Sequence, residues 1–296
     1  MTDPTPSYAK YDLHLHTYWS YDATTQPESY FKHARKHGIR CIAITDHHII
    51  DSEKEVAAIT PKYPEIRFIP AAELSVDTSF GAIDLLCYGF PKERPPELTK
   101  VFNRYHEWQR AIGAAFSEGM LALGHDFTDA HRLELLQSYR PAQTIDLQGN
   151  THVKGAFICD YFVKRGFIAK AGDHPDLINR LQEKVSFPPY PDVESVTAAV
   201  KASGALIAIA HPFFYFNGHD IKVMDTLREE CSLDGIECAH KIVPPKYTTL
   251  YRDYCLQHNL FSVGGSDCHS DNDINDSVGL HNGKDEWLDE FLARLN

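Results

Sequence analysis

The chain has 296 residues, of which 43% are hydrophobic and 24% charged, a composition typical of globular proteins and unlike that of disordered or collagen-like chains. Its formal net charge of −12 argues against a surface that coats duplex DNA, because such binding depends on many lysines and arginines. The N-terminus lacks the basic and apolar regions of a secretory signal, and no stretch approaches the roughly 20 apolar residues of a membrane span. We therefore expect a cytoplasmic protein that binds neither duplex DNA nor membranes.

Apolar segments typical of buried strands alternate with helical segments along most of the chain. A strand is expected in YAKYDLHLH, then a helix in PESYFKHARKHG, with Pro27 suited to its first turn and Gly38 to its C-cap, then a strand in IRCIAIT. Later strands are expected in IRFIPAAEL, GAIDLLCYGF, ALIAIAHP, DGIECAH and LFSVGGSD, and later helices in VESVTAAVKASG, KVMDTLREE and YTTLYRDYCLQHN. This alternation predicts an α/β fold with a mainly parallel sheet that can close as a barrel.

The segment 94–190 breaks this rhythm, because it is expected to form helices separated by polar loops. The helices are expected in LTKVFNRYHEWQRAIGAAFSEGM, FICDYFVKRGF and PDLINRLQEK. The segment carries 12 Lys and Arg against 11 Asp and Glu, a net charge of +1 that leaves −13 for the rest of the chain. We interpret 94–190 as a helical subdomain inserted into a domain made of 1–93 and 191–296, and expect this insert to choose the substrate. Within it, HEWQR and HRLELL have the spacing of solvated helix faces.

Histidines and carboxylates collect at the predicted C-terminal ends of six strands. They are Asp12, His14 and His16 at the first, Asp46, His47 and His48 at the second, Glu73 at the third, and His211, His240, Asp267 and His269 at the last three. The C-terminal strand ends of a parallel barrel form its active face, so these groups are expected to converge. Residues i and i+2 of a strand point the same way, so His14 and His16 should face the site together. The same argument pairs Asp267 with His269 and turns Cys268 away.

Each residue taken alone has a simpler explanation. A single strand-end histidine such as His211 is usually a hydrogen-bonded core residue, and Asp46 could cap a helix. Six strand ends with such groups together favour a metal site, where imidazole and carboxylate ligands suit Zn, Mn or Fe. Asp12 has the parity to lie beneath the first pair and hold an imidazole tautomer. The seven cysteines form no CxxC pair and are expected to be reduced core residues.

The motifs DLHLHT, ITDHH, AAELS, IAHP and GGSDCHS resemble, in order and approximate spacing, those of the polymerase and histidinol phosphatase (PHP) family. The resemblance implies a distorted, TIM-like (β/α)7 barrel that holds two or three divalent ions, Mn, Fe or Zn, at its C-terminal face. It implies the metal ligands His14, His16, Asp22, His47, Glu73, Asp84, His211, Asp267 and His269, supported from behind by Asp12 and Asp46. Asp22 falls one residue later than in the common family pattern, and Asp84 stands where many members have histidine.

The resemblance also implies a hydrolase of phosphoric esters that uses a metal-activated hydroxide, with His48 or His240 protonating the leaving group. The insert and DGIECAH look most like the branch that acts on nucleotides, nucleoside bisphosphates or short RNA ends. The expected partner is therefore a nucleotide or another phosphorylated small molecule. Two alternatives stay open, a small-molecule phosphatase similar to histidinol phosphatase and a non-catalytic metal-binding PHP module. Amidohydrolase chemistry is disfavoured, because no strand ends in a lysine that could be carboxylated.

Overall fold

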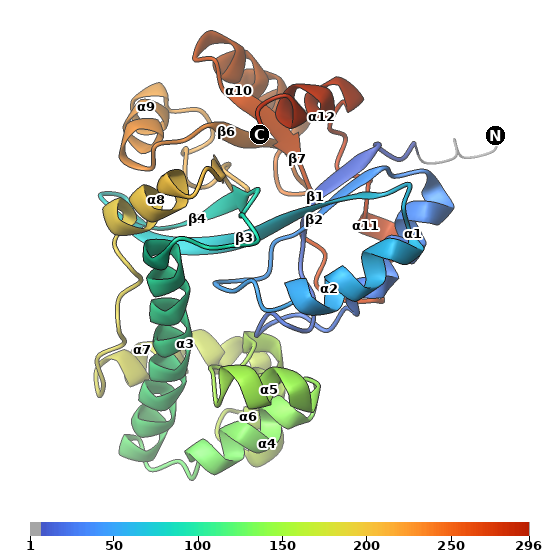
Figure 1. Cartoon of the computed structure of the whole chain (residues 1–296). Coiled ribbons are helices and arrows are strands. Elements are labelled where there is room, and N and C mark those ends of the chain that lie inside the picture. The colour runs from blue at the N-terminus through green and yellow to red at the C-terminus, as the bar shows by residue number, and fades with distance from the viewer. Residues whose placement is uncertain (1–6, 296) are drawn as a thin grey trace, which may run out of the picture.

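The computed structural model describes residues 7–295, and its seven strands form one sheet, in chain order, that wraps into a nearly closed barrel (Figure 1). The strands are β1 (Tyr11–Leu15), β2 (Cys41–Ile44), β3 (Arg67–Thr78), β4 (Gly81–Tyr88), β5 (Leu206–Ile209), β6 (Gly235–Ala239) and β7 (Phe261–Gly264). The first and last strands meet just beyond β7, where Leu15 pairs with Cys268 and the N–H of Asp267 donates to the carbonyl of His14 at 2.8 Å. The predicted seven-stranded α/β barrel is confirmed.

β4 departs from the expected parallel arrangement. It pairs antiparallel with both β3 and β5, whereas the other neighbouring strands of the sheet run parallel. β3 continues beyond Glu73, where it was expected to end, and turns directly into β4 through a tight turn at Gly81, whose φ is +97°. A chain that reverses in so short a turn has no room for a crossover helix and must pair antiparallel. The beginning of β4, rather than its end, therefore lies at the active face.

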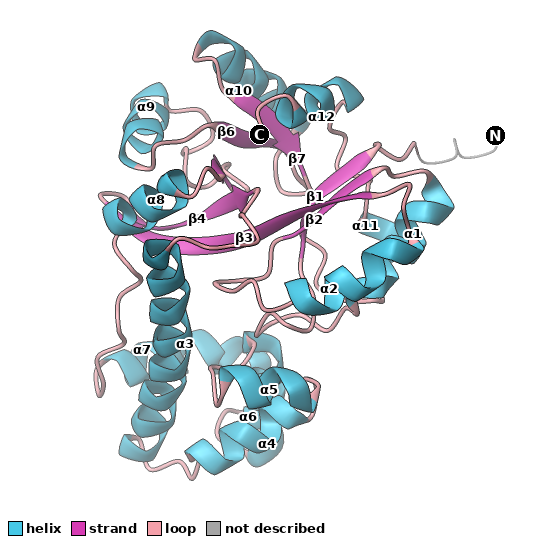
Figure 2. Ribbon diagram, in the orientation of Figure 1, coloured by secondary structure: helices cyan, strands magenta, loops and turns pink. Residues whose placement is uncertain are grey.

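Helices cover the outside of the barrel (Figure 2). They are α1 (Pro27–His37), α2 (Glu53–Ile59), the 3-10 helix η1 (Thr60–Lys62), α8 (Val193–Ala202), α9 (Ile221–Glu230), α10 (Pro245–Gln257), α11 (Ile274–Ser277) and α12 (Asp285–Leu292). α1 has the predicted ends, with Pro27 in its first turn and Gly38 as a left-handed C-cap. The seven cysteines are buried free thiols, as predicted. None of the helices within 7–295 is long and apolar enough to cross a membrane.

The segment between β4 and α8 is helical and gathers on one side of the barrel (Figure 1). Its elements are α3 (Pro96–Ala122), α4 (Asp129–Gln137), α5 (Ala142–Gln148), α6 (Gly155–Arg165), the 3-10 helix η2 (Ala171–Asp173) and α7 (His174–Gln182). It has a hydrophobic core of its own, which includes Phe127, Phe162 and Leu181. α5 lies where a polar loop was expected. Residues 94–190 are called the insert below.

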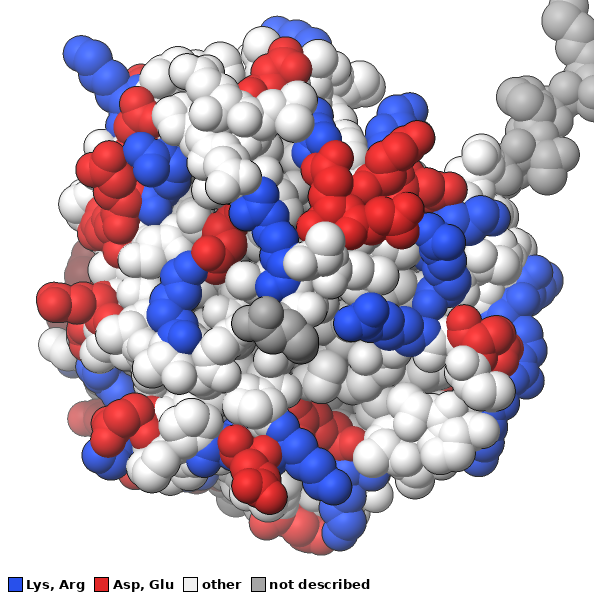
Figure 3. Space-filling view, turned by 45° about the horizontal axis from the view of Figure 1, so that its top comes forward, with Lys and Arg blue, Asp and Glu red and all other residues white. Residues whose placement is uncertain are grey.

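The prediction that HEWQR and HRLELL form solvated helix faces is wrong. Trp108 is 8% exposed and packs edge-on against His48, with ring centroids 5.0 Å apart. Arg132 is 2% exposed, and its guanidinium donates to the carbonyl of Gly113 and, at 3.1 Å, to Oδ1 of Asn150. A buried arginine is tolerated when its donors are paired, and spacing along a helix does not reveal such partners. On the face in Figure 3, basic and acidic side chains are interspersed rather than gathered into a continuous basic surface.

Candidate metal centre

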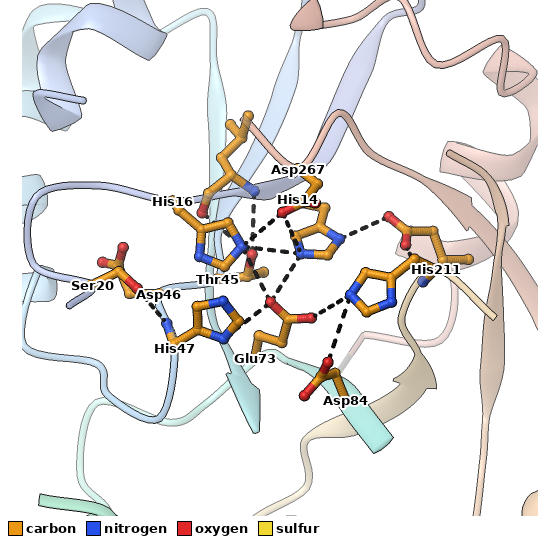
Figure 4. Close-up of polar contacts among 12 residues, drawn as sticks. His14, His16, Ser20, Thr45, Asp46, His47, Glu73, Asp84, His211 and Asp267 are labelled. Carbon is orange, nitrogen blue, oxygen red and sulfur yellow. Dashed lines mark hydrogen bonds and ion pairs between the residues drawn. The ribbon is translucent and has the colours of Figure 1, made fainter. Parts of the chain in front are cut away.

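The expected ligands converge at one end of the barrel (Figure 4). Four groups of side chains place donor atoms within 4.8 Å of one another: His14, His16 and Glu73; Glu73, Asp84 and His211; His16, Asp22, His47 and His269; and His14, Glu237 and His240. Asp267 joins them, because its Oδ1 lies 3.3 Å from both His16 Nε2 and His269 Nδ1. The structure therefore places side by side residues that are more than 200 positions apart in the sequence, such as His16 and His269, as expected from their positions at strand ends.

The first group has the geometry of ligands facing one cation. His14 Nε2 lies 3.1 Å from His16 Nε2 and 3.1 Å from Glu73 Oε2. His16 Nε2 lies 3.2 Å from the same carboxylate oxygen. Two ring nitrogens that face each other can share only one hydrogen atom, whereas two lone pairs aimed at a common cation account for the whole arrangement. This buried set of nitrogen and oxygen donors fits a divalent transition-metal ion.

Glu73 connects the first group to the second. Its Oε2 faces His14 and His16, while its Oε1 lies 3.1 Å from His211 Nε2. Asp84 lies near the beginning of β4, with Oδ2 3.8 Å from the same His211 nitrogen. Ser75 donates to Asp84 Oδ1 at 2.5 Å, which fixes the carboxylate from behind. One carboxylate with an oxygen in each group suits two neighbouring cations.

Asp84→Ala is expected to weaken the ion bound by Glu73 and His211 and to leave the other ions in place. The reason is that Asp84 is the only carboxylate besides Glu73 in this group. Elemental analysis of metal-supplemented protein gives the ion content. Asp77→Ala, which changes a carboxylate of the same β3–β4 hairpin outside these groups, is the matched control. Full ion content and full rate in Asp84→Ala would show that this carboxylate is no ligand.

The third group includes Asp22 despite its late position in the sequence motif. Asp22 Oδ2 lies 3.1 Å from His269 Nε2 and 3.4 Å from His47 Nε2. The Ser20 hydroxyl donates to Asp22 Oδ1 at 2.7 Å and accepts the backbone N–H of His47 at 3.2 Å. Ser20 thus joins the loop after β1 to the loop after β2, and both loops carry candidate ligands.

Cation binding by the third group is expected to strengthen as pH rises. Burial lowers the pKa of His47, but the carboxylates of Asp22 and Glu73 outweigh it and raise this pKa to about 10. At neutral pH the imidazole is then protonated in the cation-free protein, and a cation must displace that proton. Affinity should rise by up to about tenfold per pH unit between pH 6 and 8. Calorimetric titration with Mn²⁺ in buffers of different ionisation enthalpy measures both affinity and proton release. A constant affinity without proton release would contradict this expectation.

Glu237 was not predicted from the sequence, yet it orients His14. Its Oε1 accepts a hydrogen bond from His14 Nδ1 at 3.0 Å, and its Oε2 accepts the backbone N–H of His211 at 2.6 Å. A proton on Nδ1 leaves the Nε2 lone pair of His14 free to face a cation. The available signal was a single carboxylate within the apolar strand GIECA, because buried glutamates are rare unless they are paired.

Among residues 7–295, Asp12 accepts no hydrogen bond from an imidazole of the first pair, so that part of its predicted role is wrong. Its carboxylate accepts the backbone N–H groups of His14 at 3.3 Å, Ser266 at 3.1 Å and Gly279 at 2.8 Å. It therefore ties β1 to the chain that follows β7, and the imidazole is held by Glu237 instead. Strand alternation predicts which side of β1 the Asp12 side chain faces, but it does not predict that backbone N–H groups lie on that side.

Asp46 supports the site by accepting hydrogen bonds from the backbone and hydroxyl of Thr17, rather than as a helix cap. Its carboxylate accepts the N–H of Thr17 at 2.6 Å, next to His16, and α2 has Ser52 at its N-cap position. Burial raises the pKa of Asp46 to about 7, although hydrogen bonds from Thr17 oppose the shift.

The backbone is unusual at three residues of the site. His48, His211 and Asp267 have φ values of 66°, 27° and 52°. Positive φ is uncommon outside glycine and persists where the surroundings hold it in place. Because β7 ends at Gly264, the orientation of Asp267 comes from this irregular backbone rather than from strand parity. Gly265 is required there, because a Cβ atom would lie 2.2 Å from the Cβ of His14.

The two candidate acids lie in different surroundings. His240 belongs to the cluster, with Nε2 3.5 Å from Asp267 Oδ2, and its Nδ1 accepts the N–H of Ile242 at 3.2 Å. His48 is 1% exposed, contacts Ser75 Oγ through Nε2 at 2.9 Å and stacks on Tyr105 of α3. Burial and the neighbouring His47 hold the pKa of His48 well below its usual range. The structure thus places His240 in one of the four donor groups, whereas His48 belongs to none of them and reaches Asp84 only through Ser75.

Comparisons with known proteins agree with this architecture. The structure of a Bifidobacterium adolescentis protein, assigned as a metal-dependent phosphoesterase, superposes with a TM-score of 0.70 at 22% identity, with 98% of each chain covered. That of an amidohydrolase from Chromobacterium violaceum with bound sulfate has a TM-score of 0.70 at 19% identity, with 97% of each chain covered. At these identities the likeness shows the fold. No curated protein sequence matches the chain. The PHP domain model matches residues 12–185, more than half of the sequence, and the chain therefore belongs to the PHP domain family.

Proposed function

We propose that the protein is a metal-dependent phosphoesterase that hydrolyses phosphate monoesters of nucleotides, nucleoside bisphosphates or short RNA ends. The observation that carries this proposal is the position of Glu73, whose two oxygens face two separate groups of imidazole and carboxylate donors. When bound, two or three divalent ions would neutralise phosphoryl oxygens and supply a nucleophilic water at neutral pH. The residues proposed to hold them are the nine ligands implied by the family motifs.

His240 is the residue we propose as donor to the leaving oxygen. Its Nδ1 accepts the N–H of Ile242, so the hydrogen of the neutral ring lies on Nε2. That nitrogen is buried, and Oδ2 of Asp267 lies 3.5 Å away, which is too long for a strong hydrogen bond. A donor held only by this long contact beside candidate ligands is available to bond a substrate oxygen. The alternative donor, His48, already shares its Nε2 with Ser75 beneath α3.

Two lysines lie beside the candidate ligands, one of them, Lys241, with Nζ 3.5 Å from Asp267 Oδ2. A cavity of about 540 Å³ is lined by Asp22, Asp267 and His269, and Lys154 of the insert and Lys241 of the barrel also line it. Two further carboxylates, Asp273 and Asp276, border the same cavity. In a barrel segment of net charge −13, these lysines are the local groups that could offset repulsion of a substrate bearing a second phosphate.

Hydrolysis of a substrate panel tests the proposed function. Metal-supplemented protein is given nucleoside monophosphates, nucleoside bisphosphates, short RNAs, sugar phosphates, histidinol phosphate, p-nitrophenyl phosphate and a set of amides. We expect phosphate release with the highest kcat/KM on a nucleotide substrate. A preference for histidinol or sugar phosphates would favour the small-molecule alternative. Cation binding without hydrolysis of any member would favour the non-catalytic module, and cleavage of amides alone would contradict a phosphoesterase.

Lys154→Met and Lys241→Met are each expected to raise KM for a nucleoside bisphosphate by about tenfold, the scale of one lost charge-assisted hydrogen bond. KM for p-nitrophenyl phosphate, which has no second anionic group, should change much less. Lys164→Met, on the exposed side of α6, is the matched control. Equal changes for both substrates would show that the lysines do not contact a second phosphate.

A further inference from the structure

The insert contacts the loop that carries the candidate ligand Asp22. This loop, 16–26, joins β1 to α1, and two of its backbone carbonyls accept hydrogen bonds from the insert. The hydroxyl of Tyr139 donates to the carbonyl of Tyr21 at 2.7 Å. Arg140 Nη2 donates to the carbonyl of Trp19 at 2.9 Å. Both donors follow α4 directly, and the two carbonyls lie one and three residues before Asp22.

The guanidinium of Arg140 is held in place on the insert side as well. Arg140 is 3% exposed, donates to Thr151 Oγ1 at 3.2 Å and contacts Gln148 Oε1. Gln148 in turn donates to the same Trp19 carbonyl at 3.1 Å and to Asp51 Oδ2 at 2.8 Å. A buried guanidinium costs free energy unless its donors are paired, and because Nε of Arg140 has no partner among residues 7–295, the loop carbonyl is one of only three acceptors that stabilise this group.

A second contact reaches the other loop of the third ligand group. Gln109 of α3 is 1% exposed and donates from Nε2 to the carbonyl of His47 at 3.1 Å. His47 is linked to Asp22 by the Ser20 hydroxyl, which bonds the Asp22 carboxylate and the His47 N–H. The ring of Tyr21 also packs on His152 of the insert, with centroids 3.7 Å apart. The insert therefore holds the backbone beside two of the four donors in this group.

We propose that the insert positions Asp22 and His47, so that the cation bound with His16 and His269 depends on contacts made by a segment that supplies none of its ligands. Tyr139, Arg140 and Gln109 would be positioning residues. The inference rests on the proposed cation site and not on the identity of the substrate. By contrast, His14 and Glu237 lie on β1 and β6 and bond each other directly, so the first group is held largely by the barrel strands. Residues that orient ligands from outside typically change metal affinity by about 10- to 100-fold when they are substituted.

The test compares Mn²⁺ binding by the whole protein and its variants, by calorimetric titration and elemental analysis without substrate. Tyr139→Phe, which removes one hydroxyl, is expected to weaken one ion by about tenfold, and Arg140→Met to weaken the same ion at least as much. Asp22→Ala identifies that ion, because it removes a ligand of this group alone. Tyr161→Phe is the matched control, since Tyr161 packs against Phe127 and Arg165 inside the insert.

Wild-type Mn²⁺ binding in Tyr139→Phe would overturn the proposal, as would equal effects of Tyr139→Phe and Tyr161→Phe. Should Arg140→Met fail to fold, Tyr139→Phe still decides, because it changes a single polar atom. A weakened ion other than the one lost in Asp22→Ala would also contradict the proposal. Failure of the proposed function looks different: the wild type would bind its cations but hydrolyse no phosphate ester, and the comparison of ion affinities would be unaffected.

Discussion

His14→Ala and Asp267→Ala are each expected to lower kcat by about 1,000-fold or more and to reduce the bound cations. Both side chains approach His16 Nε2 and flank the position where Glu73 Oε2 meets the two imidazoles. Loss of either would leave a buried cation with too few ligands, and a single lost electrostatic contact at a reacting centre already costs about 100- to 1,000-fold. Steady-state kinetics and elemental analysis of the same preparations measure the two effects.

Asp253→Ala on α10 and His258→Ala at the C-cap of α10 are the matched controls, because they remove the same side-chain types outside the four donor groups. They should retain wild-type rate and ion content. Circular dichroism of all four variants separates lost ligands from lost fold. If His14→Ala kept full ion content and full rate, the first donor group would not be a metal site.

Most of the residues that converge at the candidate site could be predicted from the sequence, because strand alternation fixes which side chains of a strand face the same side. In DLHLHT the leucines of β1 pack in the core and the alternating histidines face the opposite side, and in ITDHH the histidines follow the end of β2. Leu13 and Leu15 are fully buried, while His14 and His16 face the donors of other strands. The seven-stranded barrel follows from the same pattern together with the family motifs.

What the sequence did not reveal depends on contacts between distant segments. The direction of β4 follows from a hairpin, because β3 continues past Glu73 to Thr78 and then turns directly into β4, and this direction determines which end of the strand carries Asp84. Glu237 appears as one polar residue in an apolar strand until His14, 223 residues away, is placed beside it. Trp108 and Gln109 of the insert contact His48 and His47 of the barrel, and no periodicity in HEWQR distinguishes such a buried contact from a solvated one.

Glu237→Gln is expected to weaken cation binding by about 10- to 100-fold while leaving the side-chain volume almost unchanged. Glu237 accepts from two donors, His14 Nδ1 through Oε1 and the backbone N–H of His211 through Oε2. A carboxylate suits two donors because it has only acceptors, whereas a glutamine amide has one acceptor oxygen and one donor NH₂. If the NH₂ faces His14, Nδ1 must become the acceptor, and the ring proton moves to Nε2, where it blocks the lone pair that faces the cation.

If the amide takes the opposite orientation, the backbone N–H of His211 loses its acceptor in a buried position, which costs about 1–3 kcal/mol. Either orientation disturbs a candidate ligand, so the variant should bind Mn²⁺ more weakly and recover turnover when Mn²⁺ is raised. Glu194→Gln, an exposed carboxylate on α8, is the matched control. Calorimetric titration gives the affinities, and the Mn²⁺ dependence of kcat gives the recovery. A loss of turnover that excess Mn²⁺ does not restore, at unchanged affinity, would instead place Glu237 in the chemical step.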